Sequence, residues 1–127
     1  MIDPKAGAGA LKLPMDALPW AVIMELAVAH GEGALKYGRH NWRKSEVCES
    51  TYLAAALRHL ISHIEGEAID PDSGLPHIVK AMASLGVLRD AQIAGTAVSD
   101  LTHTSSPDHR AALAALWSAL LDTHGAT

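Results

Sequence analysis

Apolar side chains recur at every third or fourth position along much of this 127-residue chain. The clearest stripe consists of Leu53, Leu57, Leu60, Ile61 and Ile64. Such spacing places the side chains on one face of an α-helix, whereas the strict alternation that indicates a β-strand is absent throughout the sequence. The sequence therefore predicts an all-α fold in which helices bury these faces.

Capping residues and helix breakers give the expected boundaries of the first two helices. The first is expected at 17–30, with Asp16 as its N-cap, because glycines interrupt the chain from position 31 onward. The second is expected to begin at position 50 or 51 and to continue until Asp70 and Pro71 stop it.

The rest of the chain is expected to hold two further helices and their connection. Ser73 can cap the third helix, and the fourth is expected to start near Pro107. We therefore expect a flexible segment at 1–13, one domain at 14–93, a linker at 94–106 and a C-terminal helix at 107–127.

Charge and composition exclude several classes of partner. The formal net charge of −4 provides no basic face for a nucleic acid polymer. No run of about 18 uninterrupted apolar residues is present, so we expect no membrane span. The single cysteine cannot form an internal disulfide, and the first residues lack a targeting pattern, so the sequence favours the cytoplasm.

The segment HLISHIEGEAIDPDSGLPH at 59–77 gathers four acids and three histidines. In helical register Glu67 lies at the border of the apolar face, and Asp70 follows one turn later or just past the helix end. Carboxylates this close repel one another, and a divalent cation such as Mg²⁺ or Mn²⁺ is the simplest compensation. The alternative is a solvated helix end and turn. The candidate ligand and proton-handling residues are His59, Glu67, Asp70, Asp72 and His77.

The segment KYGRHNWRK at 36–44 has the opposite charge and contains two aromatic side chains. Its cations suit a triphosphate, Tyr37 and Trp42 offer flat surfaces to a base, and Asn41 carries an amide. Arg58 could add a bidentate contact to a phosphate. The alternative is a solvated basic loop anchored by Trp42. The nucleotide-binding candidates are Lys36, Tyr37, Asn41, Trp42, Arg58 and Lys80.

These motifs occur in a characteristic order: KYG and NW, followed by RH, GE, D, SG and H. In this order they resemble the MazG-related dATP/dGTP diphosphohydrolase family found mostly in phages, over roughly residues 12–90. Within that family the chain resembles the MazZ branch, which cleaves dGTP in phages that replace adenine with 2-aminoadenine. The resemblance implies a MazG-like helical bundle whose core is completed by a homodimer or homotetramer.

The resemblance also implies hydrolysis of a purine deoxynucleoside triphosphate to the monophosphate and pyrophosphate. We prefer dGTP, leave dATP open, and expect the dGMP to supply phage nucleotide metabolism such as 2-aminoadenine synthesis. The hypothesis has two or three Mg²⁺ or Mn²⁺ ions that activate a water to attack the α-phosphorus. Its catalytic residues are Glu67, Asp70 and His77, and its metal ligands are Glu67, Asp70, Asp72 and His59.

Two alternatives belong to other functional classes. The chain could be a non-catalytic helical interaction protein whose oligomer is the functional unit, or a regulator that binds zinc through His59 and His63. Pyrophosphate release from a nucleotide would separate both of them from the enzyme.

Overall fold

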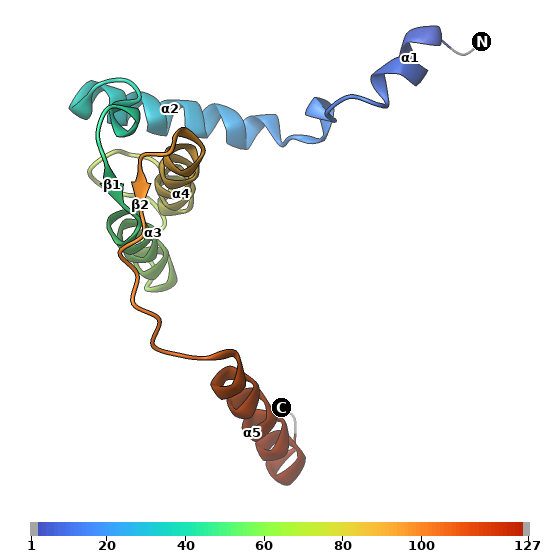
Figure 1. The fold of residues 1–127 in the computed structure, drawn as a ribbon, viewed down its shortest axis with the longest axis vertical. Helices are drawn as coiled ribbons and strands as arrows, with labels where there is room; N and C mark the ends of the chain where they lie inside the picture. Colours follow the sequence, from blue (N-terminus) through green and yellow to red (C-terminus); the bar gives the residue numbers. More distant parts are fainter. Residues whose placement is uncertain (1–2, 126–127) are drawn as a thin grey trace.

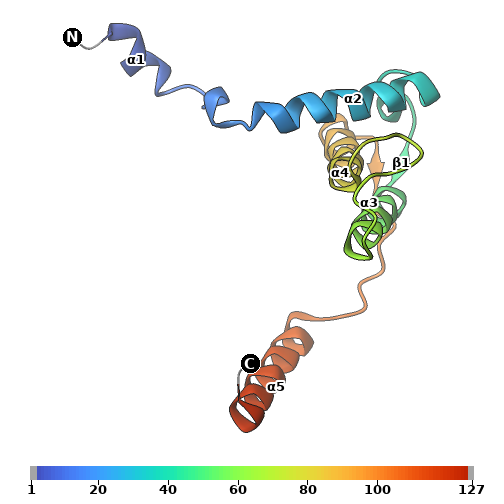
Figure 2. The same ribbon diagram turned by 180° about the vertical axis from the view of Figure 1, so that it is seen from behind.

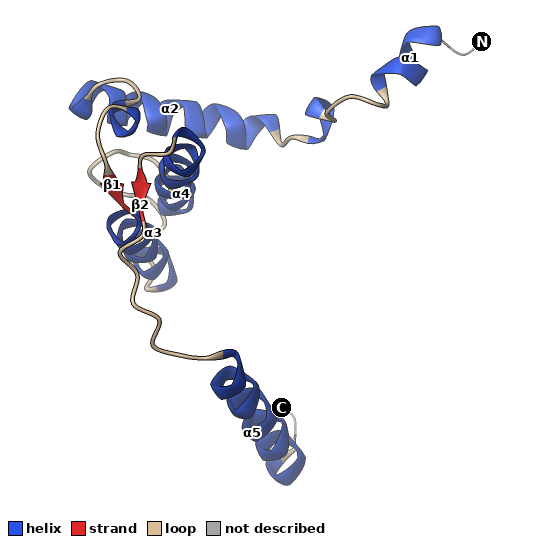
Figure 3. Ribbon diagram, viewed as in Figure 1, coloured by secondary structure: helices blue, strands red, loops and turns tan. Residues whose placement is uncertain are grey.

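The helical prediction is confirmed by the computed structural model, which describes residues 3–125 (Figures 1 and 3). The elements in chain order are α1 (Pro4–Gly9), the 3-10 turn η1 (Met15–Ala17), α2 (Trp20–Tyr37), the 3-10 turn η2 (Asn41–Arg43), β1 (Val47–Cys48), α3 (Glu49–Ile64), α4 (His77–Ala94), β2 (Ala97–Val98) and α5 (Pro107–His124). Helices α3 and α4 pair as a hairpin, and α2 crosses α4. These three helices position the candidate site.

Helix α2 differs from its prediction at both ends. Asp16 does not cap it but lies in η1, and the helix begins after Pro19. It then passes through Gly31 and Gly33 and ends only at Gly38, which has a φ of 91°. A helical glycine costs about 1 kcal/mol relative to alanine, a penalty that packing against α4 can offset. The prediction that the glycines from position 31 end the helix is therefore wrong.

Helix α3 ends earlier than expected, at Ile64, and Gly66 turns the chain with a φ of 104°. Glu67 consequently lies in a loop and not in helical register, so that part of the prediction is wrong, whereas Asp70 lies past the helix end, which was one of its two expected positions. Backbone hydrogen bonds from Asp70 N to Leu75 O (2.8 Å) and from His77 N to Ala68 O (2.9 Å) close the loop. The loop thus places the side chains of Glu67 and Asp70 beside the start of α4.

The start of α4 also departs from the prediction. The helix runs from His77 to Ala94, and Pro76 precedes it as the N-cap residue. Ser73, the predicted cap, instead bonds within the loop, where its hydroxyl donates to Asp70. His77 is therefore the first helical residue, which brings its ring close to the loop.

A two-residue parallel strand pair ties the ends of the α3–α4 hairpin together. Val47 aligns with Ala97 and Cys48 aligns with Val98. The sequence has no alternating pattern long enough to predict these strands. They join the residues just before α3 to those just after α4.

The buried residues are few, and one cluster of them lies between α2 and α4. Ala29, Val79 and Ala83 are buried there, with Leu26 and Met82 packed against them. The apolar stripe predicted on α3 is largely uncovered, because Leu57, Leu60, Ile61 and Ile64 are all exposed. The expectation that the α3 stripe is buried is therefore wrong within a single chain.

The two ends of the described chain extend away from the three-helix body (Figures 1 and 2). Helix α5 begins at Pro107 as predicted, and the Ser106 hydroxyl caps it by accepting from His109 N (3.1 Å). Its large apolar residues are exposed except for Leu121, which is half-buried. Within residues 3–125, no helix is long and apolar enough to cross a membrane. The final residues of the predicted C-terminal helix, 126–127, lie outside the described chain, as do residues 1–2 of the N-terminal segment.

Candidate metal and nucleotide site

Three side chains from three different segments converge where the α3–α4 hairpin bends. His59 comes from α3, Asp70 from the loop and His77 from the first position of α4. One ligand atom from each lies within 4.8 Å of the other two. We call this group the His–Asp–His triad.

Asp70 is held in place by the loop that carries it. Its carboxylate accepts the backbone N–H of Asp72 (3.0 Å) and the hydroxyl of Ser73 (3.1 Å). Burial by itself raises the pKa of the Asp70 carboxyl. These hydrogen bonds and the two nearby histidines outweigh burial, so the pKa of Asp70 lies below its usual value. The triad therefore contains an ionised carboxylate over the physiological pH range.

The two histidine rings face each other through equivalent nitrogens. His59 Nδ1 and His77 Nδ1 lie 2.8 Å apart, and the ring centroids are 5.1 Å apart. Burial is the largest influence on His59 and lowers the pKa of its ring, which favours the neutral form. A neutral imidazole can offer a lone pair to a metal ion.

Glu67 contacts the other side of the His77 ring. Its Oε1 lies 2.7 Å from His77 Nε2, and His77 is buried whereas the Glu67 side chain is 55% exposed. A carboxylate at this nitrogen accepts the Nε2 proton, which leaves His77 Nδ1 bare and directed toward His59. Glu67 is thus placed to orient a ligand.

The donor set fits a divalent ion. Two nitrogens bound at about 2.0–2.1 Å and at a right angle lie ~2.9 Å apart, close to the separation of the two Nδ1 atoms. Two imidazoles and one carboxylate leave further coordination positions for water or phosphate oxygens. The triad can therefore hold a metal ion in contact with a substrate.

A small pocket of about 170 Å³ adjoins the triad between α2, α3 and α4. His59 belongs to both the triad and this pocket. We call it the inner pocket; its polar and aromatic lining includes Tyr37, Asn41, Trp42, Tyr52, His59 and Lys80. A ligand that fills the pocket can thus reach the triad.

A family model described as "dATP/dGTP diphosphohydrolase, N-terminal" matches residues 3–101. The chain belongs to this family. Searches of curated proteins and of solved structures find no match. The family match covers the triad, the loop and the inner pocket, whereas α5 lies beyond it.

Four of the residues predicted to bind a nucleotide line the inner pocket together: Tyr37, Asn41, Trp42 and Lys80. Lys36 does not line this pocket; it pairs with Asp72 at 3.1 Å and lies 3.9 Å from Glu32, the acid that Lys80 also contacts. Arg58 is exposed on α3 and, among the described residues, forms no ion pair. The predicted cations therefore do not form a single phosphate-binding cluster.

Of the four predicted metal ligands, the structure brings Asp70 and His59 together, and His77 lies with them. Glu67 reaches the triad through the His77 ring, and Asp72 points to solvent, where its side chain is 77% exposed beside Lys36. The loop geometry explains both positions, because Gly66 takes the acids out of helical register.

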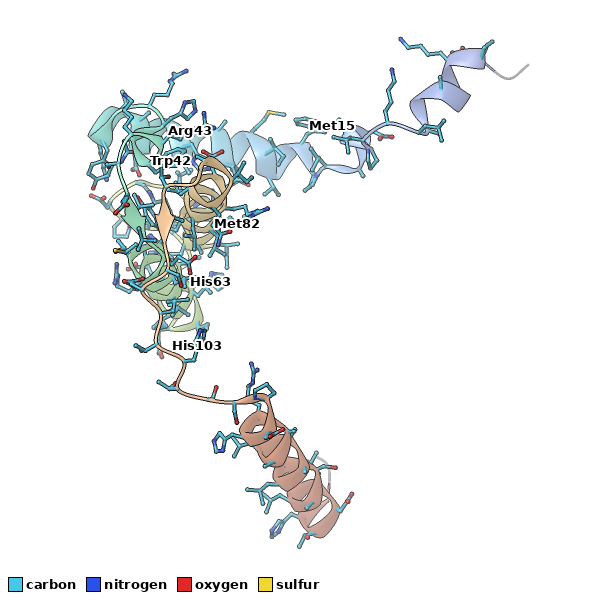
Figure 4. All side chains as sticks on the ribbon, viewed as in Figure 1. Met15, Trp42, Arg43, His63, Met82 and His103 are labelled. Carbon is cyan, nitrogen blue, oxygen red and sulfur yellow. The ribbon has the colours of Figure 1, made fainter. Side chains whose placement is uncertain are left out.

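Two groups of contacts that shape this site could not be predicted from the sequence. Lys80 pairs with Glu32 of α2, and both side chains are largely covered. Asp90 of α4 accepts a hydrogen bond from Trp42 Nε1 at 2.6 Å and binds Arg43 through two nitrogens. Figure 4 labels Trp42 and Arg43 in the segment that follows α2. The Arg43 and Trp42 hydrogen bonds lower the pKa of Asp90 to about 2. These contacts join residues 47 or 48 positions apart, so spacing along the chain does not predict them.

Proposed function

We propose that this chain hydrolyses a purine deoxynucleoside triphosphate, preferably dGTP, to the monophosphate and pyrophosphate. The family membership supports the reaction class. The observation that carries the proposal is that the triad and the inner pocket share His59. A nucleotide can thereby place its phosphates at the triad while its base occupies the pocket.

The triad residues His59, Asp70 and His77 would hold the metal ion. A bound ion supplies charge neutralisation for the phosphates and lowers the pKa of a water molecule that attacks the α-phosphorus. Mn²⁺ suits this donor set better than Mg²⁺, because imidazole nitrogen is a poorer ligand for Mg²⁺ than carboxylate oxygen. Further ions would depend mainly on the oxygens of the nucleotide, since Glu67 and Asp72 already have other contacts.

Glu67 has a positioning role in this proposal and is not itself a metal ligand. By accepting the Nε2 proton of His77 it keeps Nδ1 available as a ligand. Asp70 is kept ionised by the loop hydrogen bonds. The loop and the first turn of α4 thus prepare the ligands before an ion arrives.

The inner pocket would receive the base. Tyr37 and Tyr52 offer aromatic surface, and Asn41 can donate and accept hydrogen bonds along a base edge. Lys80 lines the pocket, and its ammonium group could donate to a phosphate beside it while it keeps its contact with Glu32. The edge of Trp42 is already bonded to Asp90, so this residue would act through its ring face.

We further propose that the active form is a homodimer or homotetramer. The accessible surface of the chain is 9657 Å², whereas a compact monomer of this mass exposes roughly 6,500 Å². The excess is comparable to the roughly 2,000–5,000 Å² buried in obligate interfaces. Exposed apolar residues at helical spacing on α2, namely Trp20, Met24, Val28 and Leu35, offer a face for a second copy.

The decisive experiment incubates the chain with each deoxynucleoside triphosphate and Mn²⁺ and measures pyrophosphate and monophosphate. We expect release from dGTP and its loss in Asp70→Asn, with unchanged circular dichroism. Mn²⁺ binding measured by calorimetry should weaken in the same variant. No pyrophosphate from any of the four nucleotides would reject the enzyme and favour the non-catalytic helical oligomer.

A further inference from the structure

A second and larger cavity, of about 520 Å³, opens between α2, η2 and α4. We call it the outer pocket. It shares His30 and Trp42 with the inner pocket, but none of the three triad residues lines it. Its volume is within the roughly 300–1,000 Å³ typical of small-molecule sites.

The outer pocket is hollow because small residues face it where α2 crosses α4. Gly31 and Ala34 line it from α2, and Gly86 lines it from α4. A Cβ atom at Gly31 would meet nothing within 4 Å, whereas one at Gly86 would meet His30 Nε2 at 3.2 Å. The space therefore lies along α2, and the His30 ring is packed against the α4 backbone.

One wall of the outer pocket is aromatic and held in place. Trp42 donates from Nε1 to Asp90, and its backbone carbonyl accepts the Thr96 hydroxyl at 2.6 Å. The rings of His30 and His40 lie 6.2 and 5.7 Å from the Trp42 ring, between centroids. A fixed aromatic corner of this kind favours a flat ring as ligand.

The charge on the rim favours an anion. The Asp90 carboxylate is neutralised by Arg43, which binds it through Nε (2.6 Å) and a second guanidinium nitrogen (3.0 Å). Arg39 also lines the pocket and, within residues 3–125, forms no ion pair. A guanidinium without a protein partner can bind a phosphate group through two parallel hydrogen bonds.

We propose that the outer pocket binds a nucleoside monophosphate, with the base against Trp42 and the phosphate at Arg39. The ligand needs no metal ion, because the triad is not part of the pocket. The choice of a monophosphate rests on the proposed function, of which it would be the product. The bound product would then contact His30 and Trp42, which also line the inner pocket.

The test uses dGMP as probe, the full chain, and EDTA to exclude metal-dependent binding. Two glycines of α2 give a matched pair, because Gly31 lines the outer pocket and Gly33 lines the inner pocket. Neither would meet another atom within 4 Å on gaining a Cβ, and both lie within the helix. We expect Gly31→Leu to weaken dGMP binding about tenfold or more in calorimetry, and Gly33→Leu to leave it within about twofold.

A second variant addresses the phosphate and does not depend on filling the cavity. Arg39→Gln should weaken dGMP binding while leaving the binding of deoxyguanosine unchanged. The proposal is overturned if dGMP does not bind at millimolar concentration, if Gly33→Leu alone abolishes binding, or if Arg39→Gln affects neither ligand. The pyrophosphate assay with Mn²⁺ is independent of these results, so failure of this site and failure of the proposed reaction are distinguishable.

Discussion

His59 and His77 point their Nδ1 atoms at each other across 2.8 Å, although the two residues are 18 positions apart and belong to different helices. Glu67 accepts the Nε2 proton of His77, so the short contact requires His59 to donate its Nδ1 proton when no cation is present. A bound cation would take the place of that proton between the two nitrogens. The pair can thus accept a metal ion with little rearrangement, and Glu67 controls its tautomer.

Substitution of Glu67 should reveal this control. In Glu67→Gln the amide can still accept a hydrogen bond but carries no charge, so His77 Nδ1 becomes a weaker ligand. We expect Mn²⁺ affinity to fall by about tenfold or more, as for other residues that orient a ligand. Titration calorimetry with Mn²⁺ measures the change.

The matched control is Glu65→Gln. Glu65 is an exposed acid two positions before Glu67, so the substitution removes the same charge nearby. Its Mn²⁺ affinity should stay close to that of the unsubstituted chain. Equal losses in the two variants would mean that Glu67 acts through general electrostatics and does not orient His77.

The Asp90 contacts predict an acid-dependent part of stability. The pKa of Asp90 is about 2 in the folded chain, below the ~3.9 of an unfolded aspartate. Its stabilisation is therefore present above pH ~4 and is lost as the pH falls toward 2. Asp90→Asn should lower the melting temperature at pH 7 and flatten its decline between pH 4 and 2.

Thermal melts across pH 2–7 measure this effect, and Asp16→Asn provides the control because Asp16 is an exposed carboxylate on η1. The control should keep the pH dependence of the unsubstituted chain. If Asp90→Asn keeps it too, the Trp42 and Arg43 contacts do not persist in solution.

Elements whose bounds depend on local pattern could be predicted from the sequence. The start of α5 at Pro107 follows from a serine cap and a proline in the first turn. The end of α3 was missed because Glu67 and Asp70 fit a continued helix equally well by spacing. Gly66 and tertiary contacts, such as that between Asp70 and Leu75, favour the loop.

Other features depend on interactions between distant segments and could not be predicted from spacing. Asp90 and Arg43 are 47 positions apart, and neither residue type indicates the other. The triad was named residue by residue from the sequence, but the tautomer control by Glu67 depends on the turn at Gly66. Periodicity gave the apolar face of α3 but could not show whether this chain or a second copy covers it.

The contact between Gly86 and His30 predicts an unusual response to alanine. A helical glycine replaced by alanine normally gains about 0.5–1 kcal/mol of stability. Gly33→Ala should show this gain because its Cβ meets open space, whereas Gly86→Ala should gain less because its Cβ meets His30 Nε2 at 3.2 Å. Chemical denaturation measures both values.

A double-mutant cycle isolates the contact. In a His30→Ala background, Gly86→Ala should recover the full gain expected of an open helical position. An unchanged effect of Gly86→Ala in the two backgrounds would show that the ring already moves aside at no cost.

The exposed face of α2 predicts that a charge will disrupt assembly. Met24 lies in the middle of the apolar residues at helical spacing, so Met24→Glu would place a carboxylate inside an interface between copies. We expect sedimentation velocity to show a smaller species than for the unsubstituted chain. Circular dichroism should show that the helical content is retained. Thr51→Glu adds the same charge at an exposed position in the first turn of α3, where acids are tolerated, and should leave the assembly unchanged. The excess surface of a lone chain is comparable to an obligate interface, so a monomeric unsubstituted protein would contradict the proposed assembly. If the Met24→Glu variant keeps the oligomer, the interface lies on another helix.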